Sequence, residues 1–222
     1  MTGTTTKAYR GIGMEGALAR WYAKSTLKDI ERFRALAARL RDAFPQGGDV
    51  LDVAPGPGYF AIEMARDGSH RVTGLDISRT MVDLARRNAA EVGVEVDFRR
   101  GDASAMPFAD NSFDVLTCSA AFKNFTHPHK ALEEMYRVLR PGGMAAVIDL
   151  NKDAPMSEIR RHFGAIGLGT VDRWMTVAAF RFILLRRAYT RAEFEQMLAD
   201  IPFREKEIQV VDGIGLELAL RK

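Results

Sequence analysis

Hydrophobic and polar positions along this chain follow two patterns, one typical of helices and one typical of buried strands. Between residues 27 and 44, apolar side chains recur at steps of three or four, which is the spacing of an amphipathic helix. The positions are Leu27, Ile30, Phe33, Leu36, Ala37, Leu40 and Phe44. This spacing predicts a helix that ends near Pro45 and the Gly47–Gly48 pair.

After this helix, strand-like and helix-like segments alternate. Apolar runs predict strands over 49–54, 71–76, 95–103, 112–120 and 144–150. Between them, helical spacing predicts helices over 59–68, 78–93 and 129–140, the second capped by Ser78 and the third stopped by the Pro-Gly-Gly at 141–143. Alternation of this kind predicts a parallel sheet with helices on both faces.

The C-terminal third has a different pattern. Residues 156–188 are predicted to be mainly helical, and Thr190 with Glu193 three positions later forms a capping-box pattern. Two β-like runs on either side of residues 212–215 predict a hairpin whose second strand is antiparallel to the rest. The expected fold class is therefore α/β, a doubly wound, mostly parallel, Rossmann-like seven-stranded sheet with an antiparallel C-terminal hairpin strand and a helical lid.

Composition limits the classes of protein. The chain has 222 residues, 47% of them hydrophobic, and a net charge of +3, so one sizeable globular domain is expected and nucleic acid is not an expected partner. One cysteine excludes an internal disulfide and fits a reducing compartment. The first residues lack a signal-peptide core, and the apolar stretch at 175–185 is too short to span a bilayer. We expect a cytoplasmic protein without a membrane span.

The stretch "VLDVAPGPGYF" at 50–60 runs from a strand into a glycine-rich loop. Gly56, Gly58 and Ala61 match the dinucleotide pattern G-x-G-x-x-G/A, a weak signal when alone. Pro55 and Pro57 remove two N–H donors that a phosphate would need. The alternative is a tight turn that binds nothing.

Carboxylates accompany this loop. Asp52 would repel a phosphate, so a cationic, phosphate-free cofactor suits the loop better. Asp76 ends the next strand, where its two oxygens could accept both hydroxyls of a ribose of NAD or of S-adenosylmethionine, or could merely favour a helix N-terminus. Asp102 ends the third strand, where it could accept from an adenine amine.

Together these motifs resemble those of class I S-adenosylmethionine-dependent methyltransferases, in the small-molecule group (methyltransferase type 11) that includes the ubiquinone and menaquinone biosynthesis enzymes. The matching segments are "VLDVAPGPG", "VTGLDIS" with Met81, "GDASAMPF", "SFDVLTCS" and "ALEEMYRVLRPGG". The resemblance covers about residues 14 to 150 and implies an enzyme that uses S-adenosylmethionine and releases S-adenosylhomocysteine.

The resemblance also implies roles for individual positions. The loop Ala54, Pro55, Gly56 and Gly58, with Asp52, would hold the amino-acid end of the cofactor. Asp76 would bind the ribose, and Ile77 would pack on the adenine face. Asp102 and Ala103 would meet the adenine edge, Ser119 would lie near the methionine part, and Met81 is also counted among the cofactor-binding residues. Ala54 stands where the family most often has glycine.

The loop "AAFKNFTHPHKAL" after the fourth strand carries the candidate acceptor site. Lys123 and Asn124 could orient the acceptor, although Lys123 could equally be a solvated charge. Methyl transfer is an in-line displacement and needs a base only when the acceptor is protonated. The candidate bases are Tyr22, His127 and Asp149, the last of which could instead be a structural cap. We expect no metal, because no carboxylate or cysteine cluster completes the H-x-H that begins at His127.

We divide the chain into an N-terminal helical cap, 1–45, and a cofactor-binding methyltransferase domain, 46–222, with a helical insertion at about 155–188. The apolar segment 174–185 could pack on the sheet, line a lipophilic acceptor pocket or form a homodimer interface. The expected function is methyl transfer to a small lipophilic or aromatic acceptor at O, N, S or C. The alternative is a catalytically silent cofactor-binding or regulatory protein.

Overall fold

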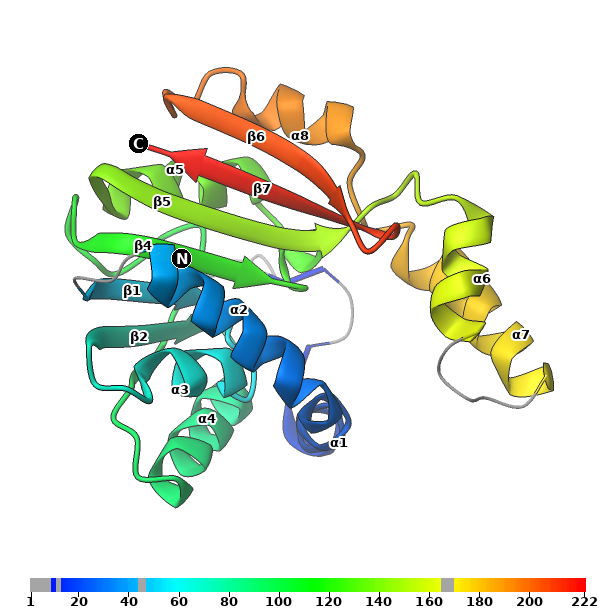
Figure 1. The fold of residues 1–222 in the computed structure, drawn as a ribbon, viewed down its shortest axis with the longest axis horizontal. Helices are drawn as coiled ribbons and strands as arrows, with labels where there is room; N and C mark the ends of the chain where they lie inside the picture. Colours follow the sequence, from blue (N-terminus) through cyan, green and yellow to red (C-terminus); the bar gives the residue numbers. More distant parts are fainter. Residues whose placement is uncertain (1–8, 11–12, 44–46, 165–169) are drawn as a thin grey trace, which may run out of the picture.

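A seven-stranded sheet forms the centre of the protein (Figure 1). The computed structural model describes residues 9–10, 13–43, 47–164 and 170–222. In the order β3-β2-β1-β4-β5-β7-β6, the strands are β3 (Asp97–Arg100), β2 (His70–Asp76), β1 (Gly48–Val53), β4 (Phe113–Ser119), β5 (Leu139–Leu150), β7 (Gly215–Arg221) and β6 (Glu205–Val211). The first five pair in parallel, whereas β7 is antiparallel to both β5 and β6. The predicted fold class is confirmed.

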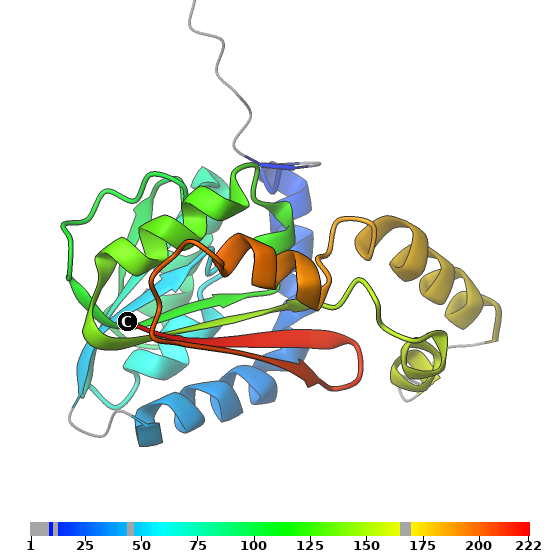
Figure 2. The same ribbon diagram turned by 90° about the horizontal axis from the view of Figure 1, so that it is seen from above.

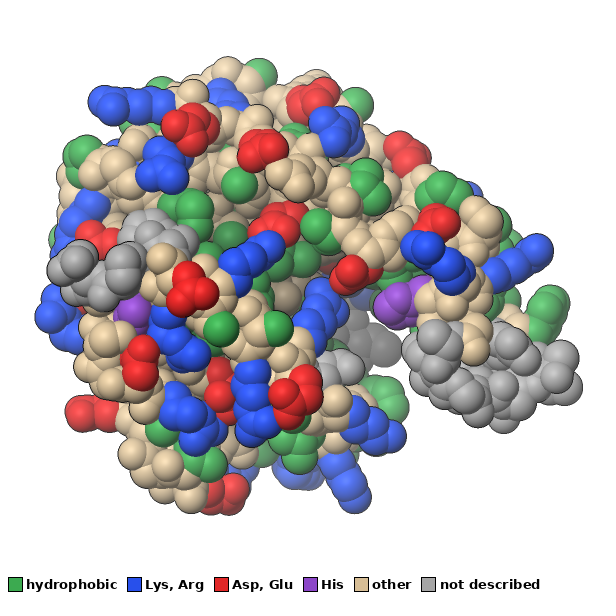
Figure 3. Space-filling view, viewed as in Figure 1, with side chains coloured by type: hydrophobic (Ala, Val, Ile, Leu, Met, Phe, Trp, Pro, Cys, Tyr) green, Lys and Arg blue, Asp and Glu red, His purple; other side chains and the backbone are tan. Residues whose placement is uncertain are grey.

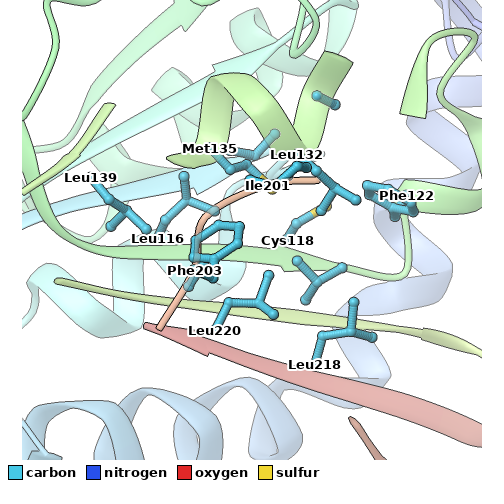
Figure 4. Packing of buried hydrophobic residues seen from close by; sticks show 14 of the residues in the cluster. Leu116, Cys118, Phe122, Leu132, Met135, Leu139, Ile201, Phe203, Leu218 and Leu220 are labelled. Carbon is cyan, nitrogen blue, oxygen red and sulfur yellow. The ribbon is translucent and has the colours of Figure 1, made fainter. Parts of the chain in front are cut away.

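Helices cover both faces of this sheet (Figures 1 and 2). One face carries α2 (Ile30–Ala43), α3 (Tyr59–Ala65) and α4 (Arg79–Glu91), and the other carries α5 (Pro128–Val138) and α8 (Arg191–Leu198). On the second face, Met135 packs with Leu116 and Leu218 in the larger hydrophobic core (Figure 4), to which Phe194 of α8 also belongs. The opposite core joins Leu40 and Phe60 to the strands.

The predicted start of β5 was wrong. The helix before it ends at Val138, and the strand begins at Leu139 and runs through the Pro-Gly-Gly, with a register shift between Phe113 and Val115 on the neighbouring strand. A prolyl ring is tolerated here because the irregular pairing does not need its missing N–H. The strand predicted over 95–103 is shorter, because Asp102 turns back to bridge Ala105.

The two predicted helix caps and the predicted hairpin are confirmed. The Ser78 hydroxyl accepts from Met81 N–H at 3.0 Å, and Thr190 and Glu193 form the predicted capping box at the start of α8. The hairpin turn between β6 and β7 places Asp212 and Gly213 at positive φ, 52° and 72°, as tight hairpins require. The predicted helix end near Pro45 lies outside the described residues.

The remaining helices lie at the ends of the parallel strands. They are α1 (Gly16–Thr26), the turn η1 (Leu27–Asp29), α6 (Met156–Gly164), α7 (Thr170–Ala179) and the π-helical segment η3 (Phe180–Leu184). The last three have a small core of their own, in which Ile159, Val177, Phe180 and Leu185 pack around Ile214 of the hairpin. None of the helices within the described ranges is long and apolar enough to cross a bilayer. The division at residue 45 stays a prediction.

Candidate functional site

The candidate polar residues meet at the carboxyl edge of the parallel strands. Asp52 of β1 pairs in register with Gly74 of β2 on one side and with Thr117 of β4 on the other. Because parallel strands end at the same edge of a sheet, the loops that follow them enclose one crevice. Asp76 and Asp149, near the ends of β2 and β5, lie along the same edge.

The glycine-rich loop turns its amides into the protein. Gly56 N–H donates to Asp76 Oδ2 at 3.0 Å, and Gly58 N–H donates to the Pro55 carbonyl at 3.0 Å. With Pro55 and Pro57 lacking donors, these bonds leave the loop poorly suited to a phosphate. This agrees with the interpretation of the loop from its sequence.

The two glycines of the loop have different reasons to be glycine. A Cβ on Gly58, at φ 80°, would lie 2.6 Å from Phe98 Cζ and 2.9 Å from Ala85 Cβ, so close packing of helix on sheet requires glycine there. A Cβ on Gly56, at φ 55°, would lie 3.9 Å from Tyr22 Cε1. Gly56 therefore faces α1, and the expected approach of a ligand to bare backbone applies to it rather than to Gly58.

Ala54 adopts the left-handed conformation that glycine prefers. Its φ is 58°, and its N–H donates to the Leu75 carbonyl at 2.8 Å. An alanine in this region costs about 1–2 kcal/mol relative to ordinary backbone. The substitution has left the path of the loop intact, at the cost of local strain.

Asp52 carries an unsatisfied oxygen. Its side chain is buried; Oδ1 accepts from the Thr117 hydroxyl at 3.0 Å, while Oδ2 has no hydrogen-bond partner among the described residues. Burial raises the pKa of Asp52 to about 7, against the lowering effect of the Thr117 hydrogen bond, and nearby Asp76 adds to the rise. Such an orphaned acceptor favours a ligand that brings a donor, above all a cationic one.

Asp76 is held more firmly. Its Oδ1 accepts from Ser78 N–H at 2.8 Å and its Oδ2 from Gly56 N–H. Burial raises the pKa of Asp76 to about 6, although both backbone hydrogen bonds lower it. A carboxylate has about four lone-pair sites, so two oxygens that each hold one amide can still accept a pair of hydroxyls.

The other residues expected at the cofactor differ in how far they are exposed and in the hydrogen bonds that they form. Ile77 is half-buried just beyond β2, whereas Met81 is 2% exposed and belongs to the packed interior of α4. Asp102 Oδ1 accepts from the amide and the hydroxyl of Ser104, both at 2.8 Å, which fixes the turn after β3. Ala103 packs against the larger core, and Ser119 is half-buried at the end of β4.

The interpretation of Lys123 as a solvated charge was wrong. Its side chain is buried, and Nζ forms an ion pair with Asp149 Oδ1 at 2.9 Å. Asp149 Oδ2 accepts from Lys123 N–H at 2.7 Å, and Oδ1 also accepts from Leu150 N–H at 2.7 Å. Asp149 was a candidate base or a structural cap. Lys123 and Leu150 donate to its two oxygens, which favours the structural cap.

The remaining candidate catalytic residues are spread along the mouth of the crevice. Tyr22 lies beside Gly56. Asn124 belongs to the short helix η2 (Phe122–Asn124), and its carbonyl accepts from Arg10 N–H at 2.7 Å. His127 is exposed at the N-cap of α5. His129 pairs instead with Asp200, at 2.8 Å.

Tyr9 is the functional candidate that the sequence did not rank. It forms an isolated bridge with Phe125, which brings the N-terminal segment across the loop after β4. Burial raises the pKa of its hydroxyl; Arg187 lowers it, and Tyr22, Asp76 and Asp149 raise it further. The bridge places Tyr9 beside the loop that follows β4. Only the aromatic content of the N-terminal segment could have indicated it.

A pocket of about 150 Å³ adjoins the ion pair at the ends of β4, β5 and the hairpin. Its apolar lining comes from Ala120, Ile148, Leu150, Phe180, Val211 and Ile214. Its polar lining includes Arg32, Asp149, His162 and Asp212. A space of this volume is about the size that holds a single aromatic ring, and here its lining is both apolar and charged. Among the described residues, no group of three or more His, Cys, Asp or Glu side chains could hold a metal.

Part of this chain is similar to known methyltransferases. Residues 51–147 match a family model described as a methyltransferase domain. A demethylmenaquinone methyltransferase of Deinococcus radiodurans is 43% identical over 101 residues, which cover 45% of this chain and 42% of that protein. A ubiquinone/menaquinone biosynthesis C-methyltransferase of Roseobacter denitrificans is 41% identical over 109 residues, 48% of this chain and 44% of that protein. The matched part is less than half the length of either relative.

Solved structures show the same fold. A methyltransferase of Aquifex aeolicus described as SAM-dependent superposes with a TM-score of 0.64 at 19% identity, covering 86% of this chain and 97% of that one. A plantazolicin methyltransferase, solved with a substrate analogue and SAH, gives a TM-score of 0.69 at 15% identity, covering 92% and 88%. At these identities the likenesses show the fold alone, and the methyltransferase-domain match over residues 51–147 is what agrees with the resemblance recognised in the sequence.

Proposed function

Residues 51–147 carry a methyltransferase domain, and on this premise we propose that the protein transfers a methyl group from S-adenosylmethionine to a small lipophilic or aromatic acceptor. The observation that supports the proposal most directly is the unsatisfied Oδ2 of buried Asp52. A cofactor with an ammonium group and no phosphate supplies the missing donor and is compatible with an inward-turned, proline-containing loop.

The residues at the edge fit the remaining parts of this cofactor. The free lone pairs of Asp76 suit two ribose hydroxyls, and Ile77 offers an apolar contact for the adenine ring. Asp102 and Ala103 would lie at the adenine edge, with Ser119 near the methionine part. When bound, the cofactor supplies a methyl group on a cationic sulfonium. The protein would contribute orientation and exclusion of water, for which we propose Tyr22, beside Gly56, and Tyr9, bridged to Phe125.

For the acceptor we propose a compound of the quinone class, methylated at carbon. Support comes from the names of the two relatives and from the aromatic-ring-sized pocket beside Asp149. Carbon methylation of a hydroquinone removes a proton, so a base is required. Asp149 is committed to Lys123, and His127 is exposed. Tyr22, beside Gly56, is the candidate base that we retain, with Lys123 and Asn124 as positioning residues.

The first test is titration calorimetry with S-adenosylmethionine, S-adenosylhomocysteine and NAD. We expect the two sulfur compounds to bind and NAD not to bind. Asp52→Asn keeps the shape of the side chain and the Thr117 contact, but it replaces the orphaned oxygen by a donor. A lost hydrogen bond to a charged group is worth about 1.5–3 kcal/mol, so affinity should fall about ten- to hundredfold.

Asp42→Asn is the matched control, because this carboxylate is exposed near the end of α2. It should bind like the natural protein. Equal binding by Asp52→Asn would remove the support for the cofactor assignment. The acceptor class is then tested by transfer of a labelled methyl group to a demethylmenaquinol analogue, with a simple phenol for comparison; label on the phenol oxygen alone would contradict carbon methylation.

The silent-protein alternative rested on Ala54 and on the absence of a clear base. Ala54 adopts the left-handed φ that glycine prefers, so its methyl group does not prevent this conformation of the loop. The second ground is met only by the base that we propose, Tyr22.

A further inference from the structure

The outer side of α7 and η3 is apolar although it faces solvent. Trp174 is 73% exposed and Phe182 is 67% exposed, with Met175 and Leu184 beside them. The inner side of the same helices is already filled, because Val177, Phe180 and Leu185 form the small core around Ile214. The exposed set is therefore not explained by packing on the sheet, which the sequence had favoured as the default.

Helix α1 repeats this arrangement. Trp21 is 66% exposed and Leu18 lies one turn before it. Exposed cations at Arg20, Lys24 and Lys28 surround the pair. At this exposure, Trp21 does not pack the segment onto the core.

Charge is concentrated where these side chains lie. Residues 156–187 contain six arginines and two acidic residues, an excess of four positive charges. The whole chain has 32 basic and 29 acidic residues, so the rest of it carries one more acidic than basic residue. Arg160, Arg181 and Arg186 are exposed. Figure 3 shows basic side chains beside hydrophobic ones at the outer rim of this lobe.

Both helical segments lie beyond the carboxyl edge of the parallel strands (Figures 1 and 2). Glu15, at the N-cap of α1, accepts from the first amides of α4, and Tyr22 lies over Gly56. In the other segment, the small core of α6 and α7 rests on Ile214 at the start of β7. The exposed aromatic side chains Trp21, Trp174 and Phe182 therefore lie among exposed basic residues in both segments.

We propose that this end docks on the surface of a lipid bilayer containing anionic lipids. Tryptophan prefers the membrane–water interface, where its apolar ring and its N–H are both accommodated, and arginine pairs with anionic headgroups. A second copy of this chain would present the same cations, so two such surfaces would repel each other. The inference goes beyond the proposed reaction and does not depend on it.

The test is co-sedimentation of the whole chain with vesicles, one set of phosphatidylcholine alone and one containing about a third phosphatidylglycerol. We expect binding to the anionic vesicles at least tenfold tighter than to the neutral ones, and weaker at high salt. The double variant Trp174→Ser/Phe182→Ser should bind at least tenfold more weakly. Val210→Ser, which removes an apolar side chain 54% exposed on β6, should bind as the natural protein does.

Charge is tested separately. Arg181→Glu/Arg186→Glu should lose the preference for anionic vesicles, whereas Arg204→Glu, on the loop before β6, should keep it. Far-ultraviolet circular dichroism verifies that every variant is folded. Equal binding to both vesicle types, or binding to neither, would overturn the proposal. So would a dimer in sedimentation velocity that the Trp174/Phe182 variant abolishes, because that result would assign the surface to a second copy.

Because vesicle binding needs no cofactor, its failure would leave the proposed reaction unaffected. Conversely, failure of S-adenosylhomocysteine to bind would leave the surface inference unaffected.

Discussion

Lys123 Nζ lies 2.9 Å from Asp149 Oδ1, and the two side chains are 8% and 1% exposed. This buried ion pair joins the loop after β4 to the end of β5, at the wall of the aromatic-sized pocket. Removing one partner leaves the other charge buried, which typically costs about 3–5 kcal/mol.

We therefore expect Lys123→Met to lower the free energy of unfolding by about that amount in urea titration. The double variant Lys123→Met/Asp149→Asn should recover part of the loss, because no buried charge remains. Lys152→Met is the control: its ion pair with Glu193 is about 40% exposed on both sides and should be worth about 0–1 kcal/mol. A loss as small as that for Lys123→Met would contradict the buried pair.

Asp52 should make stability depend on pH. Its pKa in the folded protein is about 7, above the ordinary value of 3.8, so the folded state keeps a proton that the unfolded state releases. The contribution to stability is full below pH 3.8 and disappears as pH rises through 7.

Asp52→Asn removes this titration. Its stability relative to the natural protein should therefore rise from pH 5 to pH 8, by an amount on the order of 2–3 kcal/mol. The measurement is urea unfolding at four pH values, with Asp42→Asn expected to show no such change. A constant difference between the two proteins would mean that Asp52 is ionised across the whole range.

Ala54→Gly should relieve backbone strain. Glycine removes the left-handed penalty of about 1–2 kcal/mol but loses about 0.5–1 kcal/mol of chain entropy, so a net gain of up to about 1 kcal/mol is expected. Ala120, also at φ 58°, is the matched control and should show the same gain on substitution by glycine. In calorimetry, Ala54→Gly should tighten the binding of S-adenosylhomocysteine, whereas Ala120→Gly should not. An equal effect of the two variants on binding would argue against a cofactor contact at Ala54.

Gly58→Ala should destabilise the fold by about 2–5 kcal/mol, the sum of backbone strain and overlap with Phe98 and Ala85. Gly68→Ala separates the two effects. Gly68 has φ 72° but nothing within 4 Å of an added Cβ, so only the strain of about 1–2 kcal/mol remains. Thermal or urea unfolding of both variants gives the difference, and equal losses would mean that packing plays no part.

The sequence by itself determined the succession of strands and helices along the chain and the C-terminal hairpin. It also determined the caps at Ser78 and Thr190 and the glycine-rich loop with its neighbouring carboxylates. These features depend on periodicity, turn chemistry and short spacings, which neighbouring residues decide. The tertiary structure was needed to show which carboxylates along this edge are engaged by the protein's own donors, as Asp149 is, and which keep an unsatisfied oxygen, as Asp52 does. Gly58 is close to Phe98, and Lys123 to Asp149, only because strands far apart in sequence lie side by side.

The same reason explains the errors. The start of β5 depended on pairing with β4 rather than on the local Pro-Gly-Gly signal. The exposure of Trp21 and Trp174 depended on which face of each helix the sheet and the small core had already covered. Burial of a charge and exposure of an aromatic ring both contradict single-residue preferences, so only long-range packing could decide them.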